Sequence, residues 1–255
     1  MSTRFSLAVL TAFACVLVAA PAFADDRNPH SWEIHDGERP QPPKVDPGPY
    51  TGPLTPPGDA IVLFDGTNFD HWRGNDGDAA WRIIEDEKAM QVVPESGDIQ
   101  TRESFSDVQL YVEFKTDPDS PGSGQSRSNS GVFFGPYEVQ VLDTYDNPTY
   151  ADGIAGSIYG QYPPLVNASR PAGEWQSFNI IYRAPSFDED GAIEEPARIT
   201  VFHNNILVQD SEPLVGPTSH GERTDYFPHG DLHIRLQDHR DDPIHFRNIW
   251  VRELN

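Results

Sequence analysis

The sequence contains only one cysteine, Cys15, among 255 residues. It lies in an apolar run at residues 5–20, which we interpret below as part of a leader that is removed. A mature chain without this leader has no cysteine, so it forms no disulfide and performs no thiolate chemistry. A G-x-S-x-G motif is also missing, and nucleophilic serine chemistry of that class therefore has no support.

Basic residues are scarce. The chain has 18 Lys and Arg against 40 Asp and Glu, which gives a formal net charge of −22. Such a charge argues against binding to nucleic acid or to an anionic membrane surface. It fits a soluble exported protein that acts on neutral ligands, although acidity that only keeps the protein in solution explains most of these carboxylates equally well.

The N-terminus has the three parts of a secretory signal peptide. Arg4 is the positive region, residues 5–20 are the apolar region, and Ala22-Phe23-Ala24 is a small-residue cleavage signal. The run is too short for a membrane span, and no other stretch approaches that length. We expect residues 1–24 to be removed near Ala24 and the protein to be secreted or periplasmic. A lipobox ending at Cys15 fits poorly, because this cysteine lies in the middle of the run.

Residues 25–57 are rich in proline, glycine and charge and poor in apolar side chains. This composition predicts a flexible N-terminal segment, either an exposed tether or a segment wrapped over the domain. Trp32 and Tyr50 could fix it locally. We expect the folded domain to span residues 58–255, and a chain starting at Gly58 to fold.

The rest of the chain reads as short β-strands joined by turns. Residues 108–115 alternate cleanly between an apolar and a polar set, and Asn204-Asn205 suits the positive φ angles of a type I′ hairpin turn. No segment has a sustained helical period with caps. The pattern predicts an all-β fold, an antiparallel two-sheet jelly-roll sandwich of the concanavalin and glucanase kind.

The most informative stretch is residues 128–143, SNSGVFFGPYEVQVLD. Gly135-Pro136 predicts a turn between two paired strands. In the second strand Tyr137, Val139 and Val141 share one face and suit a core, whereas Glu138 and Gln140 share the opposite face. A carboxyl group and an amide on a rigid sheet, facing away from the core, are suited to binding a sugar.

A second polar stripe follows in the predicted strand 232–237, where His233, Arg235 and Gln237 alternate with apolar residues and His239 continues the stripe. Both stripes could equally be solvated surface. His239 lies in an Asp-His-Arg-Asp-Asp run that could bind a divalent cation, but its spacing matches no strong metal motif. We expect the carboxylates of that run, Asp238, Asp241 and Asp242, to be solvated loop charges.

From about Ala60 to Leu254 the chain resembles the 3-keto-disaccharide hydrolase family. The segments that carry the resemblance are Leu63-Phe64-Asp65-Gly66, Trp72, Asn129-Ser130-Gly131-Val132, Tyr137 to Asp143, Gly156-Ser157-Ile158-Tyr159, Gly173-Glu174-Trp175, Leu236-Gln237-Asp238-His239 and Phe246-Arg247-Asn248-Ile249. The family usually has glycine where this chain has Asn205. The resemblance implies a concanavalin-like jelly roll that hydrolyses glycosides oxidised to a ketone at C3, often with a divalent metal and without an organic cofactor.

The chemistry that this resemblance implies needs a base, an acid and an electrophile. A C3 ketone acidifies the C2 hydrogen, so a base can start an elimination that expels the group on C1, after which water adds. We assign Glu138 and His239 as acid–base residues or metal ligands. The residues assigned to bind the sugar hydroxyls or the developing oxyanion are Arg127, Asn129, Gln140 and Gln237. The aromatic residues assigned to stack against the sugar ring are Tyr159 and Trp175.

Two alternatives stay open at this point. The domain could be a non-catalytic carbohydrate-binding module, which would need the aromatic and amide side chains but no base. It could also be an ordinary endoglucanase of the same fold, although Gln140 and Asp143 stand where such enzymes carry other carboxylates. A carbohydrate is the expected partner in each case, and nothing in the pattern indicates an oligomeric state.

Overall fold

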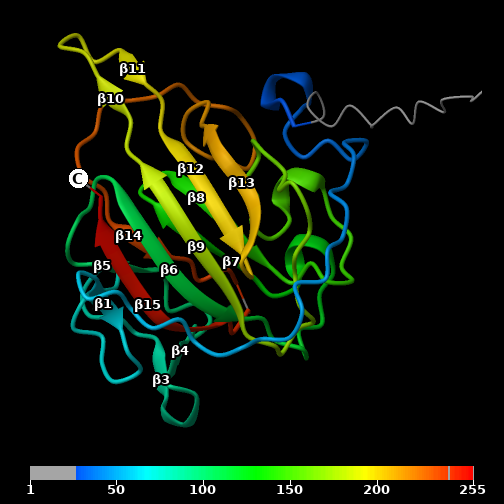
Figure 1. Ribbon diagram of the computed structural model, residues 1–255, viewed down its shortest axis with the longest axis vertical. Coiled ribbons are helices and arrows are strands. Elements are labelled where there is room, and N and C mark those ends of the chain that lie inside the picture. Colours follow the sequence, from blue (N-terminus) through cyan, green and yellow to red (C-terminus); the bar gives the residue numbers. More distant parts are fainter. Residues whose placement is uncertain (1–26, 241, 255) are drawn as a thin grey trace, which may run out of the picture.

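Two antiparallel sheets form the protein, and the computed structural model describes residues 27–240 and 242–254 (Figure 1). The expected leader and its cleavage point lie outside these residues. The larger sheet has eight strands: β13 (Ile206–Pro213), β12 (Arg198–His203), β9 (Gln176–Arg183), β6 (Val108–Lys115), β15 (His245–Glu253), β4 (Ala89–Gln91) and β3 (Arg82–Ile84) in this order, with β1 (Ile61–Phe64) also paired to β15.

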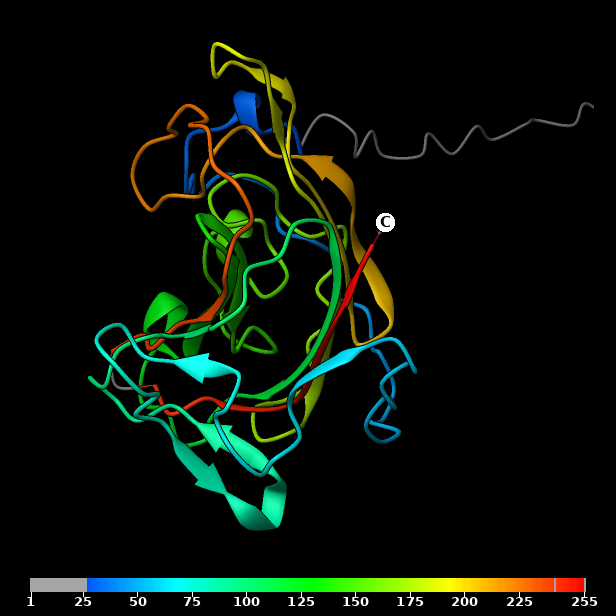
Figure 2. The ribbon, with the colours of Figure 1, turned by 90° about the vertical axis from the view of Figure 1, so that its left-hand side faces the viewer.

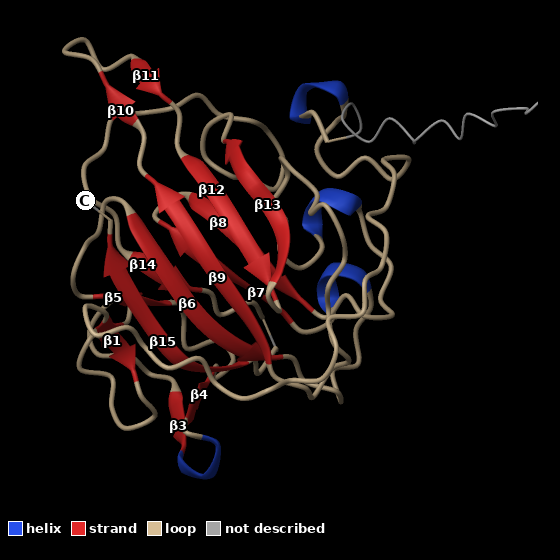
Figure 3. Cartoon of the chain, in the orientation of Figure 1, coloured by secondary structure: helices blue, strands red, loops and turns tan. Residues whose placement is uncertain are grey.

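The smaller sheet has five strands in the order β2 (Trp72–Arg73), β5 (Ile99–Thr101), β14 (Ile234–Leu236), β7 (Asn129–Phe134) and β8 (Tyr137–Leu142). A separate hairpin joins β10 (Ser186–Phe187) and β11 (Ile193–Glu195). Four 3-10 helices of three residues each lie in loops, η1 (Pro29–Ser31), η2 (Glu85–Glu87), η3 (Gly124–Ser126) and η4 (Ala151–Gly153). Figure 3 shows how little helix the fold contains.

Apolar side chains from both sheets fill the space between them. Phe134 of the smaller sheet stacks on Tyr182 of the larger sheet with ring centres 4.6 Å apart, and both are buried. Figure 2 shows the green, yellow and red strands of the larger sheet as one curved layer. The predicted all-β, two-sheet jelly-roll sandwich is confirmed.

The local predictions for two hairpins are correct. Gly135, with φ 54°, makes the turn between β7 and β8, and Tyr137, Val139 and Val141 are fully buried on the core side. Asn204 and Asn205 have φ 52° and 68°, as the turn between β12 and β13 requires. Strand alternation and turn chemistry therefore decide this part of the fold locally.

The central strand of the smaller sheet, β14, is shorter than predicted. It has three residues, whereas the prediction spanned residues 232–237. Its neighbour His233 turns outward and places its Nδ1 3.0 Å from the carbonyl oxygen of Glu103. The acidic segment that follows β9 forms the separate two-stranded hairpin of β10 and β11.

The N-terminal segment, residues 27–57, lies along the domain rather than away from it. In Figure 1 it descends one edge in blue and then crosses in front of the lower part of the larger sheet to β1. Lys44 makes a parallel bridge with Asn167, and the Tyr50 hydroxyl donates to Oε2 of Glu113 at 2.8 Å. These contacts do not agree with a flexible tether; the segment has the wrapped arrangement. The domain start at Gly58 stays a prediction.

This wrapping changes the outer face of β6. Glu113 has no solvent exposure, because Tyr50, Tyr111 and Arg247 each place a donor within 3.1 Å of its carboxylate. Burial, together with the neighbouring Glu113, raises the pKa of Tyr50 to about 12. The alternation of β6 suggests that its polar face is exposed to solvent. In the structure that face instead forms a polar interface with the N-terminal segment.

Among residues 27–240 and 242–254, no helix has the length and apolar character needed to cross a membrane.

The first prediction concerns Arg39, which is 2 % exposed and lies 3.6 Å from the fully buried carboxylate of Asp152. Its Nη1 also donates to the carbonyl oxygen of Gln161 at 3.1 Å. Arg39→Met keeps the volume but removes the charge, and a buried charge without its partner costs about 3–5 kcal/mol. We expect the free energy of unfolding, measured by urea denaturation, to fall by that order.

Lys44→Met is the matched control from the same segment. Lys44 pairs with Asp146, but both side chains are well exposed, and such a pair is worth about 0–1 kcal/mol. The double variant Arg39→Met/Asp152→Asn should recover part of the loss. Equal effects of Arg39→Met and Lys44→Met would contradict a specific, buried contribution of the Arg39–Asp152 pair to stability.

Candidate functional site

A pocket of about 420 Å³ lies on the face of the smaller sheet that points away from the core. Strand pairing builds its floor, because Arg235 of β14 is opposite Phe133 of β7, which is opposite Glu138 of β8. Loops close its sides. The pocket is lined by Gln125, Ser126, Asn129, Phe133, Glu138, Gln140, Tyr150, Tyr159, Thr218, Ser219, His220, Arg235, Gln237, His239 and Arg240.

Glu138 is the most perturbed acid in this pocket. Its side chain is only 7 % exposed, and this burial raises the pKa of Glu138 to about 8, although Arg235 opposes the shift. Gly131 makes the burial sterically feasible, since a Cβ at that position would come within 2.6 Å of Oε1 of Glu138. Near neutral pH the group is therefore mostly a neutral carboxylic acid.

A chain of side-chain amides leads to Glu138. Gln125 donates from Nε2 to the carbonyl oxygen of Gly153 at 2.8 Å, so its Oε1 faces Gln140 and accepts from the Gln140 amide at 2.8 Å. The opposite end of the Gln140 amide is then its oxygen, 2.9 Å from Oε1 of Glu138. Two oxygens at this distance need a proton between them, which a protonated Glu138 supplies, but the same Gln140 oxygen then also lies 3.0 Å from the carbonyl oxygen of Ser130, a second acceptor.

The reversed amide suits the ionised acid instead. With its nitrogen toward Glu138, Gln140 donates to Oε1 at 2.9 Å and to the carbonyl oxygen of Ser130 at 3.0 Å. Its oxygen then faces Oε1 of Gln125, which is unfavourable while Gln125 donates to Gly153. The orientation of Gln140 is thus coupled to the charge on Glu138.

His239 has an acidic neighbour of its own. Its Nδ1 lies 3.5 Å from Oδ2 of Asp242, slightly beyond hydrogen-bond length. The other oxygen of Asp242 accepts from the backbone N–H of Ser128 at 2.8 Å, which fixes the carboxylate. Asp242 is 6 % exposed, so the expectation of a solvated loop charge is wrong for it, because the chain after β14 folds back against Ser128. Asp241 lies outside the described residues.

Aromatic side chains form the opposite wall. The hydroxyl of Tyr159 is 2.8 Å from that of Tyr150 and 3.0 Å from Nδ1 of His220. Behind this wall the ring of His35 stacks on Tyr150 at 3.8 Å, and the backbone N–H of His35 donates to Asp152 at 3.1 Å. The wrapped N-terminal segment therefore supports the pocket from outside.

Six of the eight predicted site residues line this one pocket. They are Asn129, Glu138, Gln140, Tyr159, Gln237 and His239. The Asn129 amide donates to the backbone carbonyl of Gln125 at 2.8 Å, which holds that side chain, and the backbone carbonyl of Gln237 accepts from the Ser130 hydroxyl at 2.7 Å, which holds that backbone.

Two predicted site residues lie elsewhere. The Nε of Arg127 is 2.8 Å from Oδ2 of the buried Asp143, so its side chain is committed to a structural ion pair. Trp175 lies on the outer face of the larger sheet, where the guanidinium of Arg247 is 3.7 Å from its ring centre. The structure places neither side chain in the pocket.

Sequence reasoning missed the loop residues Gln125, His220 and Arg240 as pocket residues. No periodic pattern marks them, because each lies between strands. Tyr150 also lines the pocket from the connection between β8 and β9, and Arg235 was part of the predicted polar stripe.

The donor set does not fit a tightly held metal. The part of the chain that the structure describes contains no group of three or more His, Cys, Asp and Glu that could hold a metal ion. Glu138 also faces the guanidinium of Arg235, an unfavourable neighbour for a divalent cation. The metal role of Glu138 and His239 stays a prediction, and no step below depends on it.

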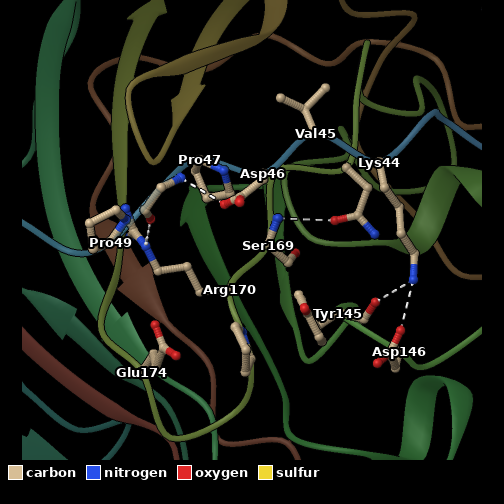
Figure 4. A pocket seen from close by; sticks show the side chains of 13 residues that line it. Lys44, Val45, Asp46, Pro47, Pro49, Tyr145, Asp146, Ser169, Arg170 and Glu174 are labelled. Carbon is tan, nitrogen blue, oxygen red and sulfur yellow. Dashed lines mark hydrogen bonds and ion pairs between the residues drawn. The ribbon is translucent and has the colours of Figure 1, made fainter.

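A larger pocket, of about 470 Å³, lies between the N-terminal segment and the loops that hold Tyr145 and Arg170 (Figure 4). Its polar groups are mostly bonded to one another. Lys44 donates to the carbonyl oxygen of Tyr145 at 2.7 Å and to Asp146 at 2.9 Å. None of the predicted site residues lines it, so size alone does not identify the functional site.

Comparison with known proteins agrees with this placement. The sequence profile of the 3-keto-disaccharide hydrolase family, described as the 3-keto-alpha-glucoside-1,2-lyase-like domain, matches residues 59–252. The chain belongs to this family. The 3-keto-disaccharide hydrolase resemblance seen in the sequence is thereby confirmed. Among curated proteins no sequence matches the chain.

Solved structures give the same answer. A candidate glycosyl hydrolase from Parabacteroides distasonis is 42 % identical, with a TM-score of 0.76, and the match covers 86 % of this chain and 94 % of that one. A second candidate glycosyl hydrolase from that organism shares the fold, with 18 % identity and a TM-score of 0.55. That match covers 77 % of this chain and 94 % of the other chain. The chain is thus a carbohydrate-active protein of the 3-keto-disaccharide hydrolase family.

The second prediction follows from the burial of Glu138. The folded pKa of about 8 lies above the ordinary value of 4.5, so ionisation costs stability progressively as the pH rises from about 4.5 through 8. Glu138→Gln cannot ionise. The free energy of unfolding of Glu138→Gln, relative to that of the wild type, should therefore rise across that pH window. The expected rise is about 1.4 kcal/mol per unit by which the folded pKa is displaced, as measured by urea unfolding at pH 5, 7 and 9.

Glu194→Gln, an exposed carboxylate of β11, is the control and should show no such trend. A constant difference between Glu138→Gln and wild type from pH 5 to pH 9 would contradict a buried, neutral Glu138.

Proposed function

We propose that the protein cleaves glycosides whose sugar carries a ketone at C3, by elimination across C1 and C2 followed by addition of water. The observation that carries the proposal is the pairing, in one amide-lined pocket, of a buried acid whose pKa is about 8 with an Asp-supported histidine. The family description, a 1,2-lyase-like domain, supports the same reaction. We also propose that the protein acts outside the cytoplasm after loss of residues 1–24.

His239 is the proposed base. The C3 ketone makes the C2 hydrogen acidic, and neutral His239 takes that proton while the electron pair moves onto the carbonyl oxygen as an enolate. Asp242 stabilises the imidazolium that forms and keeps the other ring nitrogen available. The long Nδ1–Asp242 distance of 3.5 Å should shorten when the ring becomes charged.

Glu138 is the proposed acid. As the enolate collapses to a C1=C2 double bond, the bond from C1 to the leaving oxygen breaks and Glu138 gives that oxygen its proton. The amide of Gln237 and the Oδ1 of Asn129 line the pocket and are suited to hold sugar hydroxyls, whereas the Gln140 amide and the Nδ2 of Asn129 are engaged by Gln125. The loss of the proton also favours the reversed Gln140 amide, which donates to the new carboxylate.

Water completes the reaction. It adds at C1 and gives a proton to Glu138, while His239, whose abstracted proton exchanges with solvent, gives a solvent-derived proton to C2, so both residues regain their starting states. The sum is one glycoside plus one water giving a 3-keto sugar and an alcohol.

The geometry opposes the endoglucanase alternative. Ordinary glycosidases use two carboxyl groups across the scissile bond. Glu138 is the one carboxyl group among the described residues that line the pocket, and Asp143 is paired with Arg127 outside it. A non-catalytic binding module would leave the Glu138 and His239 pair without a use.

The third prediction tests the elimination directly. If C2 loses its hydrogen during turnover, product formed from a 3-keto-glucoside in deuterated water should carry deuterium at C2, as measured by mass spectrometry and NMR. Glu138→Gln and His239→Ala should each reduce turnover by on the order of a hundredfold or more. A control with free product measures exchange by tautomerisation alone.

Turnover of unmodified β-glucans without deuterium at C2 would favour the endoglucanase. Sugar binding without any turnover, before and after addition of divalent metal, would favour the binding module.

The fourth prediction concerns the pH dependence of kcat/KM. Glu138 must be protonated to act as the acid, so activity should fall as the pH rises through its pKa of about 8. Residual activity of Glu138→Gln should lack this alkaline limb. An unchanged limb in that variant would assign the titration to another group and remove Glu138 from the role of acid.

A further inference from the structure

The active-site pocket differs in charge from the rest of the protein. The chain has more than twice as many acidic as basic residues, 40 against 18. The pocket lining reverses this ratio, with the arginines Arg235 and Arg240, the histidines His220 and His239, and Glu138 as its one described carboxyl group. Local positive charge in so acidic a protein calls for a specific explanation.

The neutral state of Glu138 strengthens the imbalance, because a protonated acid does not offset the arginines. Two carboxylates lie behind the lining and compensate part of the charge. Asp98 forms an ion pair with Arg235, and Asp242 lies beside His239. Neither of these carboxylates lines the pocket.

Among the described residues, Arg240 is the charged pocket residue without an ion-pair partner. Its side chain is exposed at the pocket, and it makes no hydrogen bond or ion pair with any residue that the structure describes. Its backbone has φ 55°, the left-handed conformation of a turn residue. The guanidinium is therefore available to a ligand.

The larger pocket of Figure 4 provides an internal comparison. Its two cations, Lys44 and Arg170, face the three carboxylates Asp46, Asp146 and Glu174. Arg170 also donates to Oδ1 of Asn204 at 2.6 Å. An anion would be repelled there, so a positive lining is not a general property of the hollows on this protein.

We propose that the active-site pocket takes a carbohydrate that bears an anionic group, a carboxylate or a sulfate, which Arg240 binds with help from His220. The inference rests on the proposed function in one respect, that the pocket binds a sugar. A net charge of −22 suggests neutral ligands for the protein as a whole. Within the pocket, Arg240 offers charge-assisted, bidentate hydrogen bonds to such a group.

Binding measurements on the full mature chain test this inference without turnover. NMR titrations at low salt would compare methyl α-D-glucuronide, methyl α-D-glucoside 6-sulfate and neutral methyl α-D-glucoside. The variants are Arg240→Gln and, as matched control, Arg183→Gln, which removes the same charge from an exposed ion pair with Asp107.

We expect at least one anionic glycoside to bind about tenfold more tightly than the neutral one. That ratio should fall several-fold in Arg240→Gln and in 0.5 M NaCl, and persist in Arg183→Gln. The ranking of glucuronide and sulfate identifies the anionic group.

Equal affinities for the three glycosides in the wild type, or equal losses in the two variants, would overturn the inference while leaving the proposed function intact. No binding of any of the three glycosides would also overturn the inference, whereas the proposed function is tested separately by turnover of a 3-keto-glucoside.

Discussion

The pairing of β14, β7 and β8 is the constraint on which the pocket depends. It sets Arg235, Phe133 and Glu138 in one row across the sheet, while the alternate residues Val139 and Val141 enter the core. A slip of one residue would exchange the two faces, placing a carboxyl group in the core and valines in the pocket. The same apolar contacts that stabilise the sandwich therefore fix the chemistry of its other face.

That arrangement is costly at Glu138. A carboxyl group with a pKa of about 8 is destabilised when ionised, and the space that it occupies exists only because Gly131 has no side chain. The hydrogen bonds from Gly153 through Gln125 and Gln140 do not satisfy the charged and neutral acid equally well. A group kept in this state is poised to release its proton when an oxygen nearby becomes basic, which is the requirement for a general acid.

The sequence predicts what depends on local periodicity and little else. Alternation locates the core face of β8 and the polar pair Glu138 and Gln140, because strand geometry leaves only two faces. It does not locate Gln125 or Arg240, which reach the pocket from loops. Trp175 lies outside the pocket for a related reason: the side chains that surround it, such as Arg247, come from strands distant in the sequence and are brought together only by the fold.

The N-terminal segment gives the pocket a second kind of support. The family match begins at residue 59, yet His35 stacks on Tyr150 and hydrogen-bonds to Asp152 behind the aromatic wall. Glu138, by contrast, is positioned by strands within the matched domain. The two walls therefore have separate origins, one in the sheet and one in a segment outside the shared domain. Changes in residues 27–57 can reshape the wall of Tyr150 and Tyr159 without disturbing the strand pairing that holds the acid.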